Sequence, residues 1–303
     1  MADTTKPSLS GPGEILRQLL LEQFVTEAGG PKPPDTLFHY TNAAGFQGIL
    51  SLQQLYLTHS AYLNDQRELS YPVGLAAKVI RTLREADGEQ AHRGFWVNLA
   101  ISSEAHSKDE QWYVGSLSIN GDQLCQWRAY TPNGGYSIGL KTATLAIEMA
   151  GNLGPVIYQE AEQVAGLERL VVRLLNKWKV GLAGATGSDA VRFNGDFFAA
   201  AAALLTRTFI FWKSPAFAGE EEWRVAQSDW GTRKRFQVRG DLLTPYRILD
   251  LPATDRHVPL NRVYVSPLGD QSLARLSAEL FMESLGYSAG LIRTTDIALR
   301  SRR

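Results

Sequence analysis

Cysteine is almost absent from this chain of 303 residues, since Cys125 is the only one. A single cysteine excludes an internal disulfide and a zinc site of the usual cysteine-based composition. Histidine is scarce as well, and no two of the five histidines stand four residues apart, the spacing that places two imidazoles on one helix face. The sequence therefore gives only weak support to a metal site.

An excess of charge of either sign is also missing. The chain has 31 basic and 31 acidic residues and a formal net charge of +0, which argues against a strongly basic nucleic-acid surface. No apolar run reaches the length of a membrane span. Residues 1–13 are polar and lack the apolar core of a signal peptide. We therefore expect a cytoplasmic protein with no membrane partner.

Several motifs of common enzymes are absent. The sequence contains no glycine-rich loop with P-loop spacing and no GxGxxG after an expected strand. It also contains no GxSxG elbow and no cysteine–histidine pair in a plausible context. Kinase, dehydrogenase and common hydrolase functions are therefore weakly supported.

The remaining composition is that of a globular protein with a core, because 44% of the residues are hydrophobic and 20% are charged. Helical and strand patterns intermix without a regular βα period, which predicts an α+β fold with a central mixed β-sheet flanked by helices. We expect residues 1–34 to form a tail, a helix and a linker. Residues 35–300 are expected to form one domain with a mainly helical insert at about 141–212.

The most unusual stretch is EEEWRV at residues 220–225. In an extended strand, Glu220, Glu222 and Arg224 share one face, and Trp223 is buried on the other. The two carboxylates then lie about 7 Å apart along the strand, and such crowding raises the pKa of one of them. This favours a carboxylate pair at the mouth of a site. The structural alternative is a solvated edge strand in which Arg224 neutralises its neighbours.

Polar residues also gather near the ends of two expected strands. His39-Tyr40-Thr41 closes a strand at 37–41, and Ser116 and Ser118 share one face of a strand at 112–119. A histidine beside aromatic residues is more often a satisfied core residue than a ligand-binding one. The two serines are more often engaged in cross-strand hydrogen bonding. Contact with a ligand is the functional alternative for both groups.

Two further pairs of residues also fit ordinary structural roles. Trp127 and Tyr130 stand three residues apart on an expected short helix, a spacing typical of core packing. The same pair can instead offer a flat aromatic wall to a base or a cationic ring. Asn64 and Asp65 fit a helix cap.

In this order, five motifs together resemble a bacterial family, the domain of unknown function 2971. They are His39-Tyr40-Thr41, Tyr62-Leu63-Asn64-Asp65 with Glu68, Ser116-Leu117-Ser118 with Asp122, Gln126-Trp127-Arg128-Ala129-Tyr130, and Glu220-Glu221-Glu222-Trp223-Arg224. The resemblance spans roughly residues 36 to 300. The family name itself implies no activity.

More loosely, the series resembles the skeleton of the ADP-ribosyltransferase superfamily: a histidine ending the first strand, a Ser-x-Ser strand and a late Glu-x-Glu strand. That resemblance implies an enzyme that cleaves the nicotinamide–ribose bond of NAD and transfers ADP-ribose to a protein or nucleic acid, or to water. It implies Glu222 as the catalytic carboxylate and His39 as the NAD anchor. Glu220 would orient or deprotonate the acceptor.

The same resemblance supplies the other expected NAD contacts. Ser116 and Ser118 would brace Glu222, and Tyr40 or Tyr130 would stack on nicotinamide. The full set of expected NAD-binding residues is His39, Tyr40, Thr41, Asn64, Ser116, Ser118, Trp127 and Tyr130. Toxin or anti-phage roles are common in this superfamily, and they imply an antitoxin as a partner.

Two other functions stay open on the sequence. In the first, the chain is a non-enzymatic binding or regulatory module whose His, Asn, Trp and Glu residues form a buried polar network. In the second, it is a metal-dependent hydrolase or nuclease with Glu220, Glu222 and Asp65 around a metal ion. NAD turnover, destabilisation by Glu222→Gln and dependence on a divalent metal distinguish the three functions.

Overall fold

The computed structural model describes residue 15 and residues 32–63, 70–109, 112–143, 153–228, 234–252, 257–295 and 297. The chain divides into two compact units, each described by itself. The helical unit takes its described elements from residues 63–110 and 157–215. The sheet unit takes its elements from residues 31–62, 111–156 and 216–303. The part of the chain predicted as a helical insert, 141–212, thus contributes to both units.

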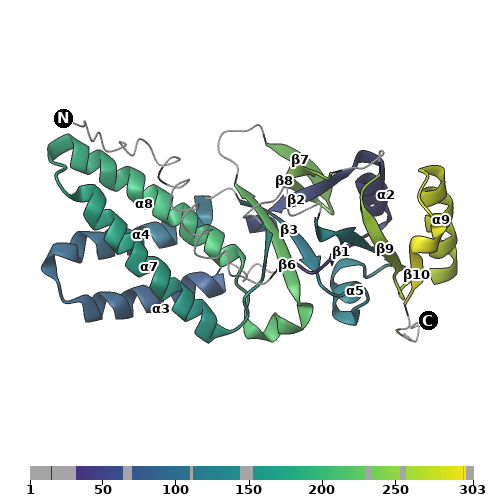
Figure 1. Cartoon of the computed structure of the whole chain (residues 1–303), viewed down its shortest axis with the longest axis horizontal. Helices are drawn as coiled ribbons and strands as arrows, with labels where there is room; N and C mark the ends of the chain where they lie inside the picture. Colours follow the sequence, from purple (N-terminus) through teal and green to yellow (C-terminus); the bar gives the residue numbers. More distant parts are fainter. Residues whose placement is uncertain are drawn as a thin grey trace. The chain divides into compact units, whose positions relative to one another are not determined.

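The helical unit is built from long helices that lie side by side (Figure 1). Its elements are α3 (Ser70–Asp87), η2 (Gln90–His92), α4 (Arg93–Asp109), α7 (Glu160–Leu182) and α8 (Gly187–Ile210). Helix α4 packs against α3 and α8, and α7 packs against the same two helices. Side chains such as Phe95, Leu99, Trp178 and Phe197 are buried between them. Residues 200–203 are all alanine and fully buried, so α8 lies close to its neighbours.

The sequence predicts only a short apolar element of uncertain type at residues 95–101, whereas the structure places these residues inside the helix Arg93–Asp109 (α4). Phe95 and Leu99, four residues apart, are buried, while Val97 and Ile101 are exposed. Because apolar residues lie on both faces, the helical period is weak in this stretch of sequence.

The sheet unit contains a mixed β-sheet with helices packed on it (Figure 1). Its strands are β1 (Thr36–Thr41), β2 (Gln54–His59), β3 (Trp112–Ser118), β4 (Tyr136–Lys141), β5 (Leu153–Pro155), β6 (Glu222–Ser228), β7 (Arg235–Arg239), β8 (Leu242–Asp250), β9 (Leu260–Val265) and β10 (Ile292–Thr294). Its helices are α2 (Ala43–Leu52), η1 (Ser60–Tyr62), α5 (Leu124–Tyr130), η3 (Pro215–Glu220), α9 (Gln271–Ser284) and η4 (Ala289–Leu291). Strand β10 runs parallel to β9, and the ladder between β4 and β9 is antiparallel. The predicted α+β class with a mixed sheet is confirmed.

The sheet forks at strand β3. Strand β6 pairs with one edge of β3 along its whole length, from Trp112 to Ser118. The other edge pairs with β2 at Tyr113 and Val114 and with β1 at Ser118. One branch therefore continues through β1, β4, β9 and β10, and the other through β2, β8 and β7.

The main core of the sheet unit takes side chains from both branches of the sheet. It joins Leu37 of β1, Leu57 of β2 and Ile138 of β4 to side chains from α2 and α9. Helix α2 is capped by the Asn42 side chain, which accepts a hydrogen bond from the backbone N–H of Gly45 at 2.9 Å. The sequence predicts this cap from Asn42 and a helix at 43–52 from the spacing of Phe46, Ile49 and Leu50, and all three side chains are buried.

Some predictions lie outside the described residues. These are the expected NAD contact Asn64, the residues Asp65 and Glu68, and most of the tail, helix and linker expected at 1–34. Within the part of the chain that the structure describes, no helix is long and apolar enough to cross a membrane.

Candidate functional site

Strand β6 begins at Glu222, two residues later than the alternation of EEEWRV predicts. Glu220 is the last residue of η3, and Glu221 has a left-handed backbone with φ of 48°. The chain therefore turns at Glu221 before it enters the sheet. The prediction that Glu220 and Glu222 share one strand face is wrong for this reason.

Glu222 and Arg224 form a buried bidentate ion pair. Arg224 Nε lies 2.8 Å from Glu222 Oε1, and Arg224 Nη2 lies 2.9 Å from Glu222 Oε2. Both side chains are only 2% exposed. The alternative of a solvated edge strand is also wrong, because β6 lies between β3 and β5. Burial of a charge requires such pairing, and Arg224 does neutralise Glu222.

The two candidate serines lie beside this ion pair. Ser118 is directly opposite Glu222 and Ser116 is opposite Arg224 in the β3–β6 ladder, so all four side chains share one face. The Ser118 hydroxyl donates to the backbone carbonyl of Glu220 at 3.1 Å and accepts from a backbone N–H two residues further on at 3.2 Å. It thus holds the turn that precedes β6.

The structure does not bring His39 to the same face. Phe38 pairs with Ser118, so Phe38 shares the face of Glu222, and the next residue, His39, points to the opposite face. His39 Nδ1 lies 3.0 Å from the Ser116 carbonyl oxygen, at the point where the sheet forks. A carbonyl only accepts, so Nδ1 is the protonated nitrogen of the neutral ring. Burial lowers the pKa of His39 below its ordinary value.

A pH titration of stability tests the environment of His39. Its folded-state pKa lies below the ordinary 6.5, so its contribution to stability is complete above pH 6.5 and is lost as the pH falls below that value. We expect the wild type to lose up to about 1.4 kcal/mol more per pH unit than His39→Gln in this window. Urea unfolding at pH 7.5 and 5.5 measures the difference, and equal losses in both proteins would contradict it.

The candidate aromatic residues Tyr40 and Trp127 are core residues. Their rings meet edge to face with centroids 4.7 Å apart. Trp127 is fully buried, and its Nε1 donates to the Asp122 carboxylate at 2.8 Å. The Tyr40 hydroxyl donates to the Asn120 carbonyl at 2.8 Å, and burial raises the pKa of Tyr40. The packing interpretation of Trp127 fits this arrangement.

The last two candidates lie at the edges of the same region. Tyr130, the final residue of α5, is partly buried against the cluster of Phe38, Tyr40 and Trp127. Thr41 ends β1 and is paired with Tyr136 of β4. The structure thus brings Tyr40, Trp127 and Tyr130 together, and Ser116 and Ser118 beside Glu222.

A surface cavity of about 430 Å³ lies on the Phe38 face of the sheet unit. Its lining includes two aromatic rings, two amides, a carboxylate and a guanidinium: Phe38, Tyr264, Asn120, Asn261, Glu221 and Arg262. We call it the Phe38–Tyr264 cavity. Sequence reasoning missed all six as site residues, although Glu221 lies inside the acidic stretch.

Glycine residues shape the floor of this cavity. The Phe38 ring lies against Gly121 and Gly139, and a Cβ at Gly139 would stand 2.8 Å from that ring. A Cβ at Gly121 would collide with the ring as well. The rings of Phe38 and Tyr264 are 6.0 Å apart and tilted by 51°. Glycine at these two positions therefore leaves room for the Phe38 ring, which lines the cavity.

Glu221 is held on the cavity rim by a strained backbone. Among the described residues, only Gln53 and Glu221 are non-glycine residues with positive φ, a conformation that costs about 1–2 kcal/mol. The Glu221 carbonyl accepts from the Ile119 N–H at 3.2 Å, and its own N–H donates to the Ala218 carbonyl at 3.3 Å. These bonds fix the turn, while the side chain stays exposed. Backbone strain of this kind gathers at functional sites.

The described residues do not place Glu220 and Glu222 in a group of possible metal ligands. In that part of the chain, the group whose ligand atoms lie within 4.8 Å of one another is Asp87, Glu89 and His92, in the helical unit. Asp65, the third residue of the predicted metal site, lies outside the described residues.

The comparisons with known proteins concern about one third of the chain. Residues 126–225 match the sequence model of one protein family, which is described as a protein of unknown function (DUF2971). The match includes the stretches 126–130 and 220–224, which carried part of the predicted resemblance. No curated protein and no solved structure matches the chain.

Proposed function

We propose that the sheet unit binds NAD in the Phe38–Tyr264 cavity and cleaves its nicotinamide–ribose bond, passing ADP-ribose to a protein, a nucleic acid or water. The observation that supports this most is that Glu221, Arg262 and two aromatic rings line one cavity. Aromatic rings stack on bases, and a guanidinium pairs with phosphate oxygens. The volume of about 430 Å³ lies in the range of small-molecule sites.

Glu221, rather than Glu222, is the carboxylate that faces the sugar under this proposal. Glu222 is buried and paired with Arg224, whereas Glu221 is exposed on the cavity rim. His39 points to the other face of the sheet, so it supports β3 and makes no contact with NAD.

The chemistry needs one carboxylate close to the ribose. When the bond from C1′ to the nicotinamide nitrogen breaks, its electron pair stays with nicotinamide, which leaves as a neutral molecule. Positive charge then builds on the ribose, as in glycoside cleavage. A carboxylate fixed beside C1′ stabilises that charge more in the transition state than in the ground state. The acceptor oxygen or nitrogen then bonds to C1′ and releases a proton.

Binding of the pyrophosphate is tested at Arg262. We expect Arg262→Gln to weaken the affinity for carba-NAD, an analogue that cannot be cleaved, by about tenfold, because one charge-assisted contact is lost. Isothermal titration calorimetry measures the affinity. Arg293→Gln is the matched control, because Arg293 is exposed on the neighbouring β10 and does not line the cavity. Equal affinities of the two variants would contradict the assignment.

The simplest test of the whole proposal is incubation of the purified wild type with NAD. Release of nicotinamide, followed by chromatography, is the expected result, with ADP-ribose or an ADP-ribosylated acceptor as the other product. Stable NAD in the presence of folded protein would overturn NAD cleavage.

The second candidate is a non-enzymatic binding module, and a specific observation favours it. The buried Glu222–Arg224 pair and the hydrogen-bonded Trp127 form polar contacts that fix the fold. If the chain is only such a module, the cavity binds a ligand without changing it. Binding of carba-NAD with no release of nicotinamide from NAD would identify this case.

A further inference from the structure

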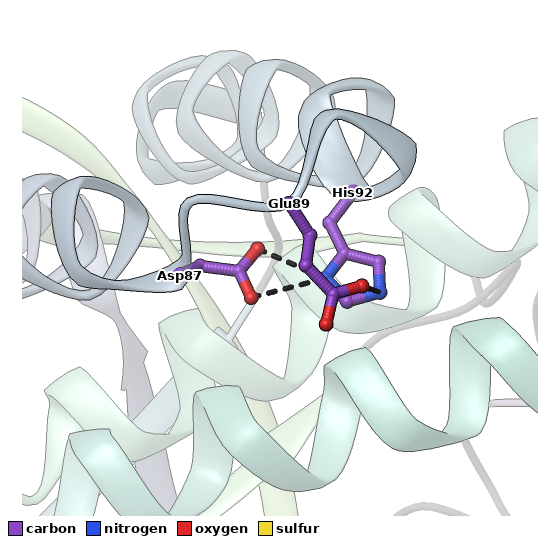
Figure 2. A group of neighbouring side chains, drawn as sticks. All are labelled: Asp87, Glu89 and His92. Carbon is purple, nitrogen blue, oxygen red and sulfur yellow. Dashed lines mark hydrogen bonds and ion pairs between the residues drawn. The ribbon is translucent and has the colours of Figure 1, made fainter.

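We propose that the corner between α3 and α4 binds a divalent transition-metal ion through Glu89 and His92, with Asp87 as the orienting carboxylate (Figure 2). The three residues lie within six positions of one another. Asp87 ends α3, Glu89 follows, and His92 ends the short η2 before α4. This corner lies within the helical unit and is independent of the NAD proposal.

The imidazole of His92 is already oriented for a metal. Its Nδ1 lies 2.9 and 3.0 Å from the two oxygens of Asp87. Asp87 is held in turn by the Trp96 indole, whose Nε1 donates to Oδ2 at 2.7 Å. A histidine that binds a metal through one ring nitrogen commonly donates the other to a carboxylate. The arrangement therefore leaves Nε2 as the metal-binding nitrogen.

The second ligand lies on the Nε2 side of the ring. Glu89 Oε2 is 3.3 Å from His92 Nε2, and Figure 2 shows the Glu89 carboxylate beside that nitrogen. An ion about 2.0–2.2 Å from each atom fits between them after a small rotation of the exposed Glu89 side chain. One imidazole nitrogen and a carboxylate oxygen are donors that suit Zn²⁺, whereas Mg²⁺ prefers oxygen ligands alone.

The exposed fractions of the three side chains suit a bound ion. The side chains of His92 and Asp87 are 7% and 16% exposed, so the protein fixes their positions. The Glu89 side chain is 64% exposed, which leaves an entry path and room for water ligands. Two carboxylates face one imidazole here, and a dication neutralises their charge. Among the described residues, Lys179 also contributes a positive charge near Asp87.

Titration of Zn²⁺ into full-length protein stripped with EDTA tests the site, with calorimetry and the melting temperature as readouts. We expect the wild type to bind one ion and Glu89→Gln to bind it at least tenfold more weakly. Glu85→Gln is the matched control, because Glu85 is exposed on the last turn of α3 and lies outside the group. Mg²⁺ at the same concentration is expected not to bind.

Two results would overturn the metal site. One is a wild type that binds no Zn²⁺, which would make the corner a purely structural ion pair. The other is a Glu89→Gln variant that binds Zn²⁺ as tightly as Glu85→Gln, which would locate the ion elsewhere. Because Glu89 is exposed, its variant is expected to fold, and the melting temperature without metal checks this. His92→Gln, a change at a buried position, serves as a second variant, which is expected to bind no Zn²⁺ if it folds.

Discussion

Replacing Arg224 with methionine is expected to lower the free energy of unfolding by about 3–5 kcal/mol. The Glu222 carboxylate would remain buried without the guanidinium that now binds both of its oxygens, at 2.8 and 2.9 Å. A carboxylate in that position either stays charged at high cost or takes up a proton. Urea or guanidinium unfolding of the wild type and the variant measures the loss, and the slopes of the unfolding free energy against denaturant concentration are compared.

An exposed pair of the same kind supplies the control. Arg275 Nε lies 2.8 Å from Glu279 Oε1 on the surface of α9, where the two side chains are 49% and 28% exposed. We expect Arg275→Met to cost no more than about 0.5 kcal/mol. The double variant Glu222→Met/Arg224→Met should recover much of the loss, because apolar residues often replace a buried pair at little cost. A loss at Arg224 as small as that at Arg275 would contradict the account of the ion pair.

The second large effect is expected in catalysis. Glu221→Gln should lower the rate of nicotinamide release by about 10²–10³-fold, because a fixed charge that stabilises the transition state is removed. The affinity for carba-NAD and the melting temperature should change little, since the Glu221 side chain is exposed and its turn is held by backbone hydrogen bonds. Single-turnover assays with excess enzyme separate the chemical step from binding.

The neighbouring carboxylates are the controls for this variant. Glu220→Gln removes the same charge one residue earlier, at a side chain that does not line the cavity, and should change the rate only a few-fold. Glu222→Gln should instead lower stability, because it disrupts the buried ion pair. A Glu221→Gln enzyme as fast as the wild type, or a Glu220→Gln enzyme that is equally impaired, would contradict the role of Glu221.

Local patterns in the sequence were enough to predict several helices and strands. The alternation of residues 112–119 predicts β3, and Asn42 with the apolar spacing after it predicts α2. These signals act between residues close together in the chain, so no knowledge of the fold is needed. Helix α4 was missed, because apolar side chains lie on both of its faces.

The turn at Glu221 had no such signal. A glycine or an asparagine commonly marks a left-handed residue, whereas glutamate does not. The alternation of EEEWRV therefore continued through Glu221 in the sequence interpretation and placed Glu220 on the face of Glu222. Hydrogen bonds set by the fold, those of Glu221 with Ile119 and Ala218 and that from the Ser118 hydroxyl to the Glu220 carbonyl, hold the turn that precedes β6.

The cavity and the fork depend on contacts between distant parts of the chain. Phe38, Asn120, Glu221 and Arg262 become neighbours because β3 pairs with β6, β1 pairs with both β3 and β4, and β4 pairs with β9. Each residue is ordinary in its own stretch of sequence. The order of the motifs along the chain likewise does not say which face of the sheet a side chain occupies. It could not show that His39 and Glu222 lie on opposite faces.

A crystal structure of the protein with carba-NAD tests the central claim most directly. The account predicts the analogue in the Phe38–Tyr264 cavity, with its pyrophosphate at Arg262 and the C1′ carbon of the nicotinamide-bearing sugar next to the Glu221 carboxylate. An analogue bound elsewhere on the chain, or bound in the cavity with that carbon out of reach of Glu221, would contradict it.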